Sequence, residues 1–204
     1  MFRRVLCVTA SAAVSGFAAA PRVVRPATVR FSTEAAAPAD FDISAIDIRV
    51  GTFVKAWHHP DSEKLFVEEI DMGEDEPRQI VSGLRAYYNE ADLAGQRCLV
   101  VANLPKAKLG GVESFGMVLC GSEGEKEKVE FVVPPEGAEN GERVSCEGFD
   151  GDALSSSQMK KKKAWPVVQP KLAVVDGVAT YDGVPLLTSA GPCRPKTILN
   201  GPIS

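Results

Sequence analysis

The chain has 204 residues, of which 45% are hydrophobic and 25% are charged, and its formal net charge is −4. This composition leaves room for one good core and a small second unit, and it excludes low-complexity and collagen-like chains. No apolar run approaches the roughly 18 residues of a membrane-spanning helix, so we expect no membrane partner. The five cysteines are scattered without a C-x-x-C pair and the two histidines are adjacent, so we expect no metal site, no disulfide framework and no cofactor.

The first 33 residues hold five arginines and no acidic residue, whereas the rest of the chain is acidic. This composition predicts an organelle transit peptide over residues 1–33, a leader without fixed structure. Arg30-Phe31-Ser32 is typical of a mitochondrial processing site, while the apolar stretch from Val5 to Gly16 resembles a plastid leader, so both organelles stay open. A disordered cytoplasmic tail is the alternative. The Ala-rich residues 34–44 are predicted to form a linker.

Short alternating or apolar runs, separated by turn residues, predict a small all-β barrel over residues 45–149. Gly51 is expected to mark a bulge or bend in the long first strand. A short helix over residues 87–94, capped by Asn89, should separate the third strand from the fourth. The expected strands cover residues 46–59, 65–72, 78–84, 97–102, 115–120, 129–133 and 143–149.

The loop over residues 103–111 is the most informative connection, because Pro105 and a pair of glycines stop regular structure there. From Leu93 to Val112 the chain has three basic residues and no acid, and two of them, Lys106 and Lys108, lie in this loop. A basic, acid-free loop on an acidic chain favours an anion-binding site. A solvated hairpin loop that carries charge for solubility is the alternative.

Three motifs in this region carry a resemblance to a known family. They are N-L-x-x-x-K-x-x-G-x-x-S-x-x-M from Asn103 to Met117, His59-Pro60 followed by Leu65, and the block Ile80-Val81-Ser82-Gly83-Leu84. The chain thereby resembles the tRNA-binding OB-fold domain family, in the branch of endothelial-monocyte-activating polypeptide II and the C-terminal extension of tyrosyl-tRNA synthetase. The resemblance implies a five-stranded Greek-key barrel with a short helix, and it implies that tRNA binds to the face that contains this loop.

The resemblance also implies which residues contact RNA. From the loop motif these are Asn103, Lys106, Lys108, Ser114 and Met117. The sequence departs from the family at Gly110, where an Arg is common, so one phosphate contact is missing there or comes from elsewhere. Arg85 and Lys55 are added only because they are basic residues near predicted strand ends.

A second basic feature follows three serines within a predicted Ser/Lys-rich linker over residues 150–163. It is a run of four lysines, all of which are predicted to contact RNA: Lys160, Lys161, Lys162 and Lys163. Such a run positions RNA by contacting phosphates without reading bases. A solvated lysine linker is the alternative. Trp165, which follows the run, either stacks on a base or packs against the barrel.

Residues 164–204 contain short apolar runs and two Gly-containing turns, which predict a small β module. About 40 residues are too few to fold alone, so this module should dock on the barrel. Its W-x-x-x-Q-P-x-L and A-T-Y-x-G-V-P blocks resemble the extra C-terminal module of the polypeptide II branch. In that branch the module mimics the partner subunit of shorter dimeric relatives, which implies a monomer.

The sequence thus predicts a tRNA-binding protein that assists an aminoacyl-tRNA synthetase, with tRNA and such a synthetase as partners. A scaffold for a synthetase complex, with secondary RNA contact, is the first alternative, and a dimeric chaperone-like protein is the second. No nucleophile elbow or phosphate-binding glycine loop is present, so no catalytic residue and no enzyme activity are expected. His58 and His59 are interpreted as structural or surface residues, and Glu68, Glu69 and Asp71 as a solvated strand face.

Overall fold

The computed structural model describes residues 41–204, which belong to one compact unit. The predicted transit peptide and most of the predicted linker over residues 34–44 lie outside the described residues. The description begins with a single 3-10 turn, η1 (Ile43–Ala45), whose N-cap residue Asp42 accepts a hydrogen bond from the backbone N–H of Ser44.

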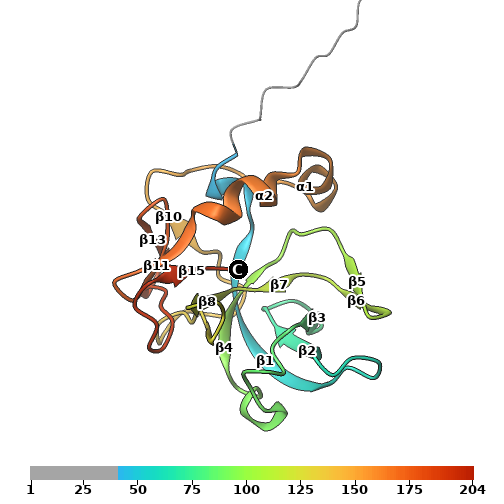
Figure 1. Ribbon diagram of the computed structural model, residues 1–204. Helices are drawn as coiled ribbons and strands as arrows, with labels where there is room; N and C mark the ends of the chain where they lie inside the picture. The colour runs from blue at the N-terminus through green and yellow to red at the C-terminus, as the bar shows by residue number, and fades with distance from the viewer. Residues whose placement is uncertain (1–40) are drawn as a thin grey trace, which may run out of the picture. The chain divides into compact units, whose positions relative to one another are not determined.

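The first half of the described chain forms a five-stranded antiparallel sheet in the order β3-β2-β1-β4-β7. The edge strand β3 is joined to the segment just before the other edge strand, β7, by two hydrogen bonds of 3.0 Å. They run from the Phe115 N–H to the Gln79 carbonyl and from the Val81 N–H to the Ser114 hydroxyl. The sheet therefore curls into a nearly closed barrel, as predicted (Figure 1). The strands are β1 (Ile48–His58), β2 (Phe66–Asp71), β3 (Arg78–Ser82), β4 (Arg97–Val101) and β7 (Met117–Val118).

The irregularity in β1 lies between Phe53 and Lys55, where the register against β2 shifts, rather than at Gly51. Gly51 serves a different purpose, since a Cβ there would lie 2.7 Å from the side chain of Ile70. The glycine lets β1 and β2 approach closely at the point where the barrel bends.

Two connections differ from their predicted form, and a further hairpin joins the last strands of this half. The loop over residues 103–111 contains half of a small hairpin made of β5 (Ala107–Leu109) and β6 (Val112–Ser114). The predicted helix over residues 87–94 is reduced to the 3-10 turn η2 (Glu90–Asp92), and the Asn89 amide donates to the Asp92 side chain instead of capping the turn. A second hairpin joins β8 (Cys120–Glu123) to β9 (Lys128–Phe131).

The predicted Ser/Lys-rich linker ends in a helix, α1 (Ser156–Lys162), which is followed by α2 (Ala164–Val168) and the 3-10 turn η3 (Gln169–Lys171). Ser155 and Gln158 form a capping box, in which each side chain bonds to the backbone N–H of the other residue. The linker prediction was wrong in this part because the serines start a helix instead of loosening the chain. Three of the four predicted RNA-contacting lysines, Lys160, Lys161 and Lys162, are therefore helical.

The C-terminal residues form a second sheet in the order β10-β13-β12-β11-β15, with β14 on the side of β13. Its strands are β10 (Ser145–Cys146), β11 (Leu172–Val175), β12 (Val178–Tyr181), β13 (Val184–Thr188), β14 (Gly191–Pro192) and β15 (Gly201–Pro202). The segment over residues 143–149 was predicted to complete the barrel, but β10 pairs with β13 of the module. The residues just before it do bond to β1, from the Val144 N–H to the Ile48 carbonyl and from the Val50 N–H to the Glu142 carbonyl.

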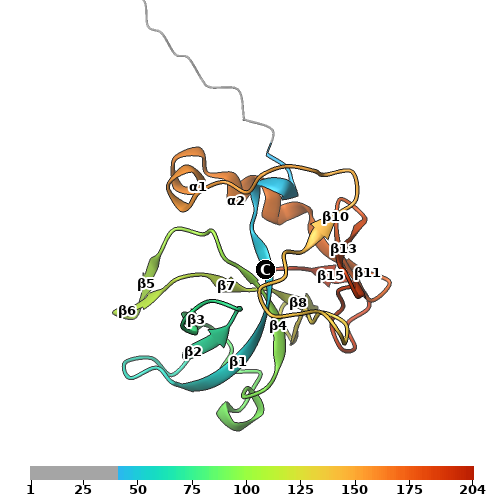
Figure 2. The same ribbon diagram turned by 180° about the vertical axis from the view of Figure 1, so that it is seen from behind.

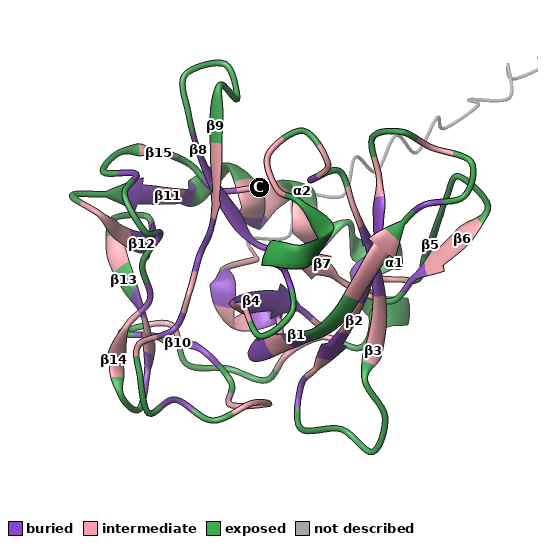
Figure 3. Cartoon of the chain, turned by 90° about the horizontal axis from the view of Figure 1, so that it is seen from below, coloured by how far each residue is buried: buried purple, intermediate pink, exposed green. Residues whose placement is uncertain are grey.

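Two clusters of buried side chains follow from the alternation along β1 and β4. Phe53 and Cys98 point into the barrel, whereas Val50 and Leu99 point out and pack against the C-terminal module. In Figure 3, β4 is coloured mostly as buried, and β11 has buried residues, Leu172 and Val174, that belong to the cluster of Val50 and Leu99. The docking of the module on the barrel is therefore confirmed. Figures 1 and 2 both place the C-terminal strands on one side of the barrel and the β5–β6 hairpin on the opposite side.

Candidate nucleic-acid interface

The β5–β6 hairpin presents the two lysines that the loop motif predicted. Lys106 and Lys108 are exposed, and the Lys106 ammonium lies 2.7 Å from a carboxylate oxygen of Glu113 on β6. The hydrogen bond from Lys106 holds the pKa of Glu113 below its ordinary value. The loop is acid-free in sequence but not in space, because Glu113 of β6 faces Lys106 across the hairpin.

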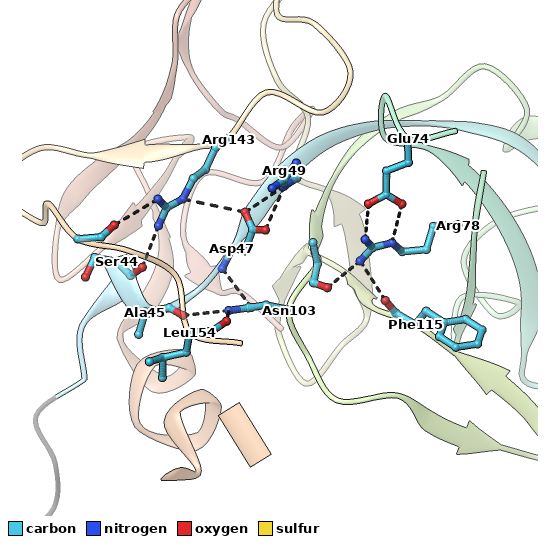
Figure 4. Close-up of polar contacts among 12 residues, drawn as sticks. Ser44, Ala45, Asp47, Arg49, Glu74, Arg78, Asn103, Phe115, Arg143 and Leu154 are labelled. Carbon is cyan, nitrogen blue, oxygen red and sulfur yellow. Dashed lines mark hydrogen bonds and ion pairs between the residues drawn. The ribbon is translucent and has the colours of Figure 1, made fainter. Parts of the chain in front are cut away.

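Asn103 sits at the base of this hairpin and is 7% exposed. Its carbonyl oxygen accepts from the Asp47 N–H at 3.0 Å, and its NH2 group donates to the carbonyls of Ala45 at 3.0 Å and Leu154 at 2.9 Å (Figure 4). Both polar atoms of the amide are thus used inside the protein. The side chain thus ties the base of the hairpin to the segments around Ala45 and Leu154, and an RNA contact of Asn103 stays a prediction for which the amide has no unused polar atom.

Ser114 and Met117, the other two non-basic residues predicted from the loop motif, also make contacts within the protein. The Ser114 hydroxyl is buried, accepts from the Val81 N–H and donates to the Gly116 carbonyl, each at 3.0 Å. Met117 is half-buried and packs against the core between barrel and module. Both residues hold the hairpin in place, and neither offers RNA a free polar group.

The tip of the hairpin is held by His59, which is 3% exposed. Its Nδ1 accepts from the Asp61 N–H at 3.1 Å, so in the neutral ring Nε2 carries the proton and donates to the Leu109 carbonyl, also at 3.1 Å. The structural interpretation of His59 is confirmed. His58 is exposed, with its Nε2 3.8 Å from a carboxylate oxygen of Glu90.

Gly110 packs directly on this histidine. A Cβ at Gly110 would lie 2.6 Å from Cε1 of the His59 ring, and the backbone has a φ of +56°, in the left-handed region. A side chain at this position would displace the histidine that holds the hairpin tip. The departure from the family pattern at Gly110 is thus matched to the local packing in this chain.

Arg78 and Phe115 are two residues that sequence reasoning missed. Arg78 binds the Glu74 carboxylate with two of its nitrogens and donates to the carbonyls of Ala102 at 2.7 Å and Phe115 at 3.3 Å (Figure 4). It thereby clamps β3 to the chain on both sides of the hairpin. The Phe115 side chain is exposed at the same place. A basic residue at the start of a strand was the one available signal for Arg78.

The structure does not bring Arg85 or Lys55 into contact with the hairpin. Arg85 is half-buried and donates to the Ser62 carbonyl at 2.8 Å, which fixes the turn before β2. The Lys55 ammonium lies 3.1 Å from a Glu69 carboxylate oxygen and 4.9 Å from the centre of the Trp57 ring.

All four lysines of the second basic run are exposed, but they do not form the extended strip that a linker would give. Lys160, Lys161 and Lys162 lie in the last turn of α1, where positive charge is favoured by the helix dipole. Lys163 ends the helix in a left-handed conformation, and the buried Met159 anchors it. Because a helix spreads successive side chains around its axis, the four ammonium groups cannot all face the same way.

Helix α1 and the β5–β6 hairpin lie on one side of the molecule in both ribbon views. One surface depression is lined by Lys106, Phe115 and Ser156, the first residue of α1. Two lysine-bearing elements that are about 50 residues apart in the chain therefore border one depression. Trp165 is half-buried against the core, so it packs instead of offering a stacking surface.

Glu68 corrects the expectation of a solvated carboxylate face. Its side chain is fully buried inside the barrel, with one oxygen accepting from the Ser82 hydroxyl and the other without a hydrogen-bond partner. Burial raises the pKa of Glu68 to about 8, against the opposing effect of the Ser82 hydrogen bond. Residues 41–204 contain no group of three metal-ligating side chains, and none of their helices has the length and apolar character to cross a bilayer.

Comparison with known proteins assigns the family. The model of the tRNA binding domain family matches residues 48–143. The mouse aminoacyl tRNA synthase complex-interacting multifunctional protein 1 is 39% identical over 164 residues, which are 79% of this chain and 52% of that protein. The cytoplasmic tyrosine–tRNA ligase of Xenopus tropicalis is 38% identical over 175 residues, or 85% of this chain and 33% of the ligase.

The solved structure of the C-terminal domain of Plasmodium vivax p43 superimposes with a TM-score of 0.72 at 39% identity. This match covers 80% of the chain and 99% of that domain. The chain spans between 33% and 52% of the length of the two curated relatives. The strands of the barrel and the β5–β6 hairpin fall within the residues that the family model matches, and the chain belongs to the tRNA binding domain family.

Proposed function

We propose that this chain binds tRNA through its shape and backbone, and that it assists an aminoacyl-tRNA synthetase. The observation that carries the proposal is that the β5–β6 hairpin and α1, which both carry exposed lysines, lie on one side of a domain of this family. Lysine ammonium groups contact phosphates without reading bases, so the lysines position folded RNA instead of selecting a sequence.

A partner synthetase is proposed from the names of the relatives, one of which is a ligase and another a protein that interacts with a synthase complex. We propose that the chain itself is not an enzyme and that the C-terminal module lets it act as a monomer, by covering the outer face of β1 and β4. We also propose an organelle location, mitochondrion or plastid, from the acid-free arginine-rich residues 1–33.

The test is tRNA binding by the full-length chain and by a Lys106→Gln/Lys108→Gln variant over a range of salt concentrations. Because each lost phosphate contact removes about 0.7 to 0.9 from the slope of log affinity against log salt, we expect weaker binding and a slope smaller by roughly 1.5. The matched control is Lys171→Gln/Lys196→Gln, which removes the same charge from exposed positions on the C-terminal module.

An unchanged affinity and slope in the hairpin variant would remove the hairpin from the interface. An equal loss in both double variants would mean that net charge, and not the hairpin, determines binding. Absence of tRNA binding at low salt would favour the synthetase scaffold, and a stable synthetase complex would then be the property to measure.

A further inference from the structure

A cavity of about 390 Å3 lies against the inner side of the β5–β6 hairpin, at the mouth of the barrel. Ala107 and Leu109 line it, whereas Lys106 lines the depression on the other side of the hairpin. This division follows from the alternation along β5, because successive side chains of a strand point to opposite faces. The hairpin that presents lysines on its outer face is therefore also the wall of an apolar cavity.

Further walls come from the segment after β3, which supplies Leu84 and Tyr87, and from β9, which supplies Val129. The Tyr87 hydroxyl donates to the Lys126 carbonyl at 3.0 Å, which fixes the aromatic side chain in the wall. Lys126 itself is exposed and lines the cavity, and among the described residues no Asp or Glu lines it.

These properties complement one chemical class of ligand. The volume is within the range of small-ligand sites, and it suits a single nucleotide but not a base-paired helix. Aromatic and apolar walls are the usual environment of an unpaired base, and a lysine at the rim suits the phosphate attached to it. The side chains that line the cavity carry one positive and no negative charge, which favours a phosphate, and Ser204, which also lines it, is tied to Cys120 by two backbone hydrogen bonds.

We infer that this cavity receives the base of one unpaired nucleotide of the bound RNA, while Lys126 and the hairpin lysines contact the neighbouring phosphates. The inference rests on the proposed binding of tRNA. It assigns the two sides of the hairpin different tasks: the outer side contacts the backbone, and the inner side distinguishes RNA with unpaired nucleotides from a plain duplex.

Gly83 offers a way to close the cavity without disturbing the barrel. It is exposed, lines the cavity, and has no atom within 4 Å of the position that a Cβ would take. Its φ lies outside the left-handed region, so a side chain adds no backbone strain. A Gly83→Val substitution should therefore add bulk at the rim of the cavity, narrow its entrance and leave the fold intact.

The experiment compares the full-length chain with Gly83→Val and with Ala91→Val, a control at an exposed position that does not line the cavity. The affinity of each protein for tRNA and for a fully paired RNA duplex is measured at several salt concentrations. Since losing one stacked base weakens binding without removing a phosphate contact, we expect Gly83→Val to weaken tRNA binding by roughly fivefold or more, with an unchanged salt slope. Duplex binding should not change in either variant.

Tyr87→Leu and Tyr87→Phe give a second, independent readout. The leucine variant should lose a similar factor in tRNA affinity, because it removes the aromatic ring, whereas the phenylalanine variant should retain most of the affinity. Thermal unfolding of each variant separates a lost site from a lost fold.

Wild-type tRNA affinity in a folded Gly83→Val variant would overturn the inference and leave the proposed function standing. The inference is also overturned if Gly83→Val keeps wild-type tRNA affinity but no longer binds a short fluorescent apolar peptide. The cavity would then be a peptide site. If the unmodified chain binds no tRNA, the proposed function and this inference fail together.

Discussion

At the tip of the β5–β6 hairpin, one glycine and one histidine determine how the lysines are presented. The His59 ring joins the Leu109 carbonyl to the Asp61 N–H, and Gly110 provides the space for that ring. One tautomer serves both contacts, because Nδ1 accepts from the Asp61 N–H while Nε2 donates to the Leu109 carbonyl. A residue interpreted as merely structural thus positions the proposed RNA-contacting hairpin.

Glu68 makes stability depend on pH in a predictable direction. Because its pKa is about 8 in the folded protein and 4.5 for a free side chain, the folded state holds a proton that the unfolded state releases. The stabilisation from this difference is complete below pH 4.5 and is lost as pH rises through 8. The free energy of unfolding of the unmodified protein should fall by a few kcal/mol as pH rises through this window. We expect this fall to be absent in Glu68→Gln when both proteins are unfolded with urea at pH values from about 5 to about 9.

The matched control is Glu69→Gln, the same change on the neighbouring residue of β2, whose side chain points to the other face and is partly exposed. Its pH profile should stay parallel to that of the unmodified protein. If the Glu68→Gln profile also stays parallel, Glu68 is ionised in the folded barrel and its environment is more polar than the contacts indicate.

At the scale of elements, the predictions succeeded where the signal is local. The strands β2, β3 and β4 were predicted to within two residues, because burial on one or both faces leaves an alternating or apolar run in the sequence. The pairing of β10 with β13 has no local signal, because the partners are about 40 residues apart.

The residues of the candidate site also divide into those with a local signal and those without one. The lysines could be found from charge alone, whereas the burial of Asn103 depends on Asp47, 56 residues away.

The start of helix α1 has a local sequence signal, but the neighbouring run of lysines led to the prediction of a linker instead. Ser155 and Gln158 have the spacing of a capping box, but the run of lysines suggested a solvated linker. Since an N-cap serine contributes about 1 kcal/mol, Ser155→Ala should loosen the first turn of this short helix. We expect faster hydrogen exchange of the α1 amides, weaker tRNA binding through the displaced lysines, and little change in the unfolding temperature of the barrel.

Ser156→Ala is the appropriate control, since it changes a serine in the first turn without touching the capping box. It should leave exchange in α1 and tRNA affinity close to those of the unmodified protein. Exchange rates in Ser155→Ala that match this control would show that Met159 and the packing of α2, and not the cap, hold the helix.

At the scale of the whole molecule, barrel and module share one hydrophobic core. Val50 and Leu99 of the barrel pack in the same cluster as Leu172 and Leu186 of the module. A module of about 40 residues buries too little surface to fold alone, and the barrel would expose the outer face of β1 and β4 without it. The two parts should therefore unfold in a single transition.

The two tryptophans of the chain test this expectation, because Trp57 lies on β1 of the barrel and Trp165 lies in α2 beside the module. Trp165→Phe leaves a reporter on the barrel and Trp57→Phe leaves one on the module. Fluorescence in urea should give the same midpoint with either reporter. Adding Leu172→Ala, which creates a cavity in the shared core worth about 2 to 5 kcal/mol, should lower both midpoints equally. The opposite result would be a lower urea midpoint for the Trp165 reporter, together with a Trp57 midpoint that Leu172→Ala does not change. It would mean that the barrel is stable alone and that the module docks on it as a separate unit.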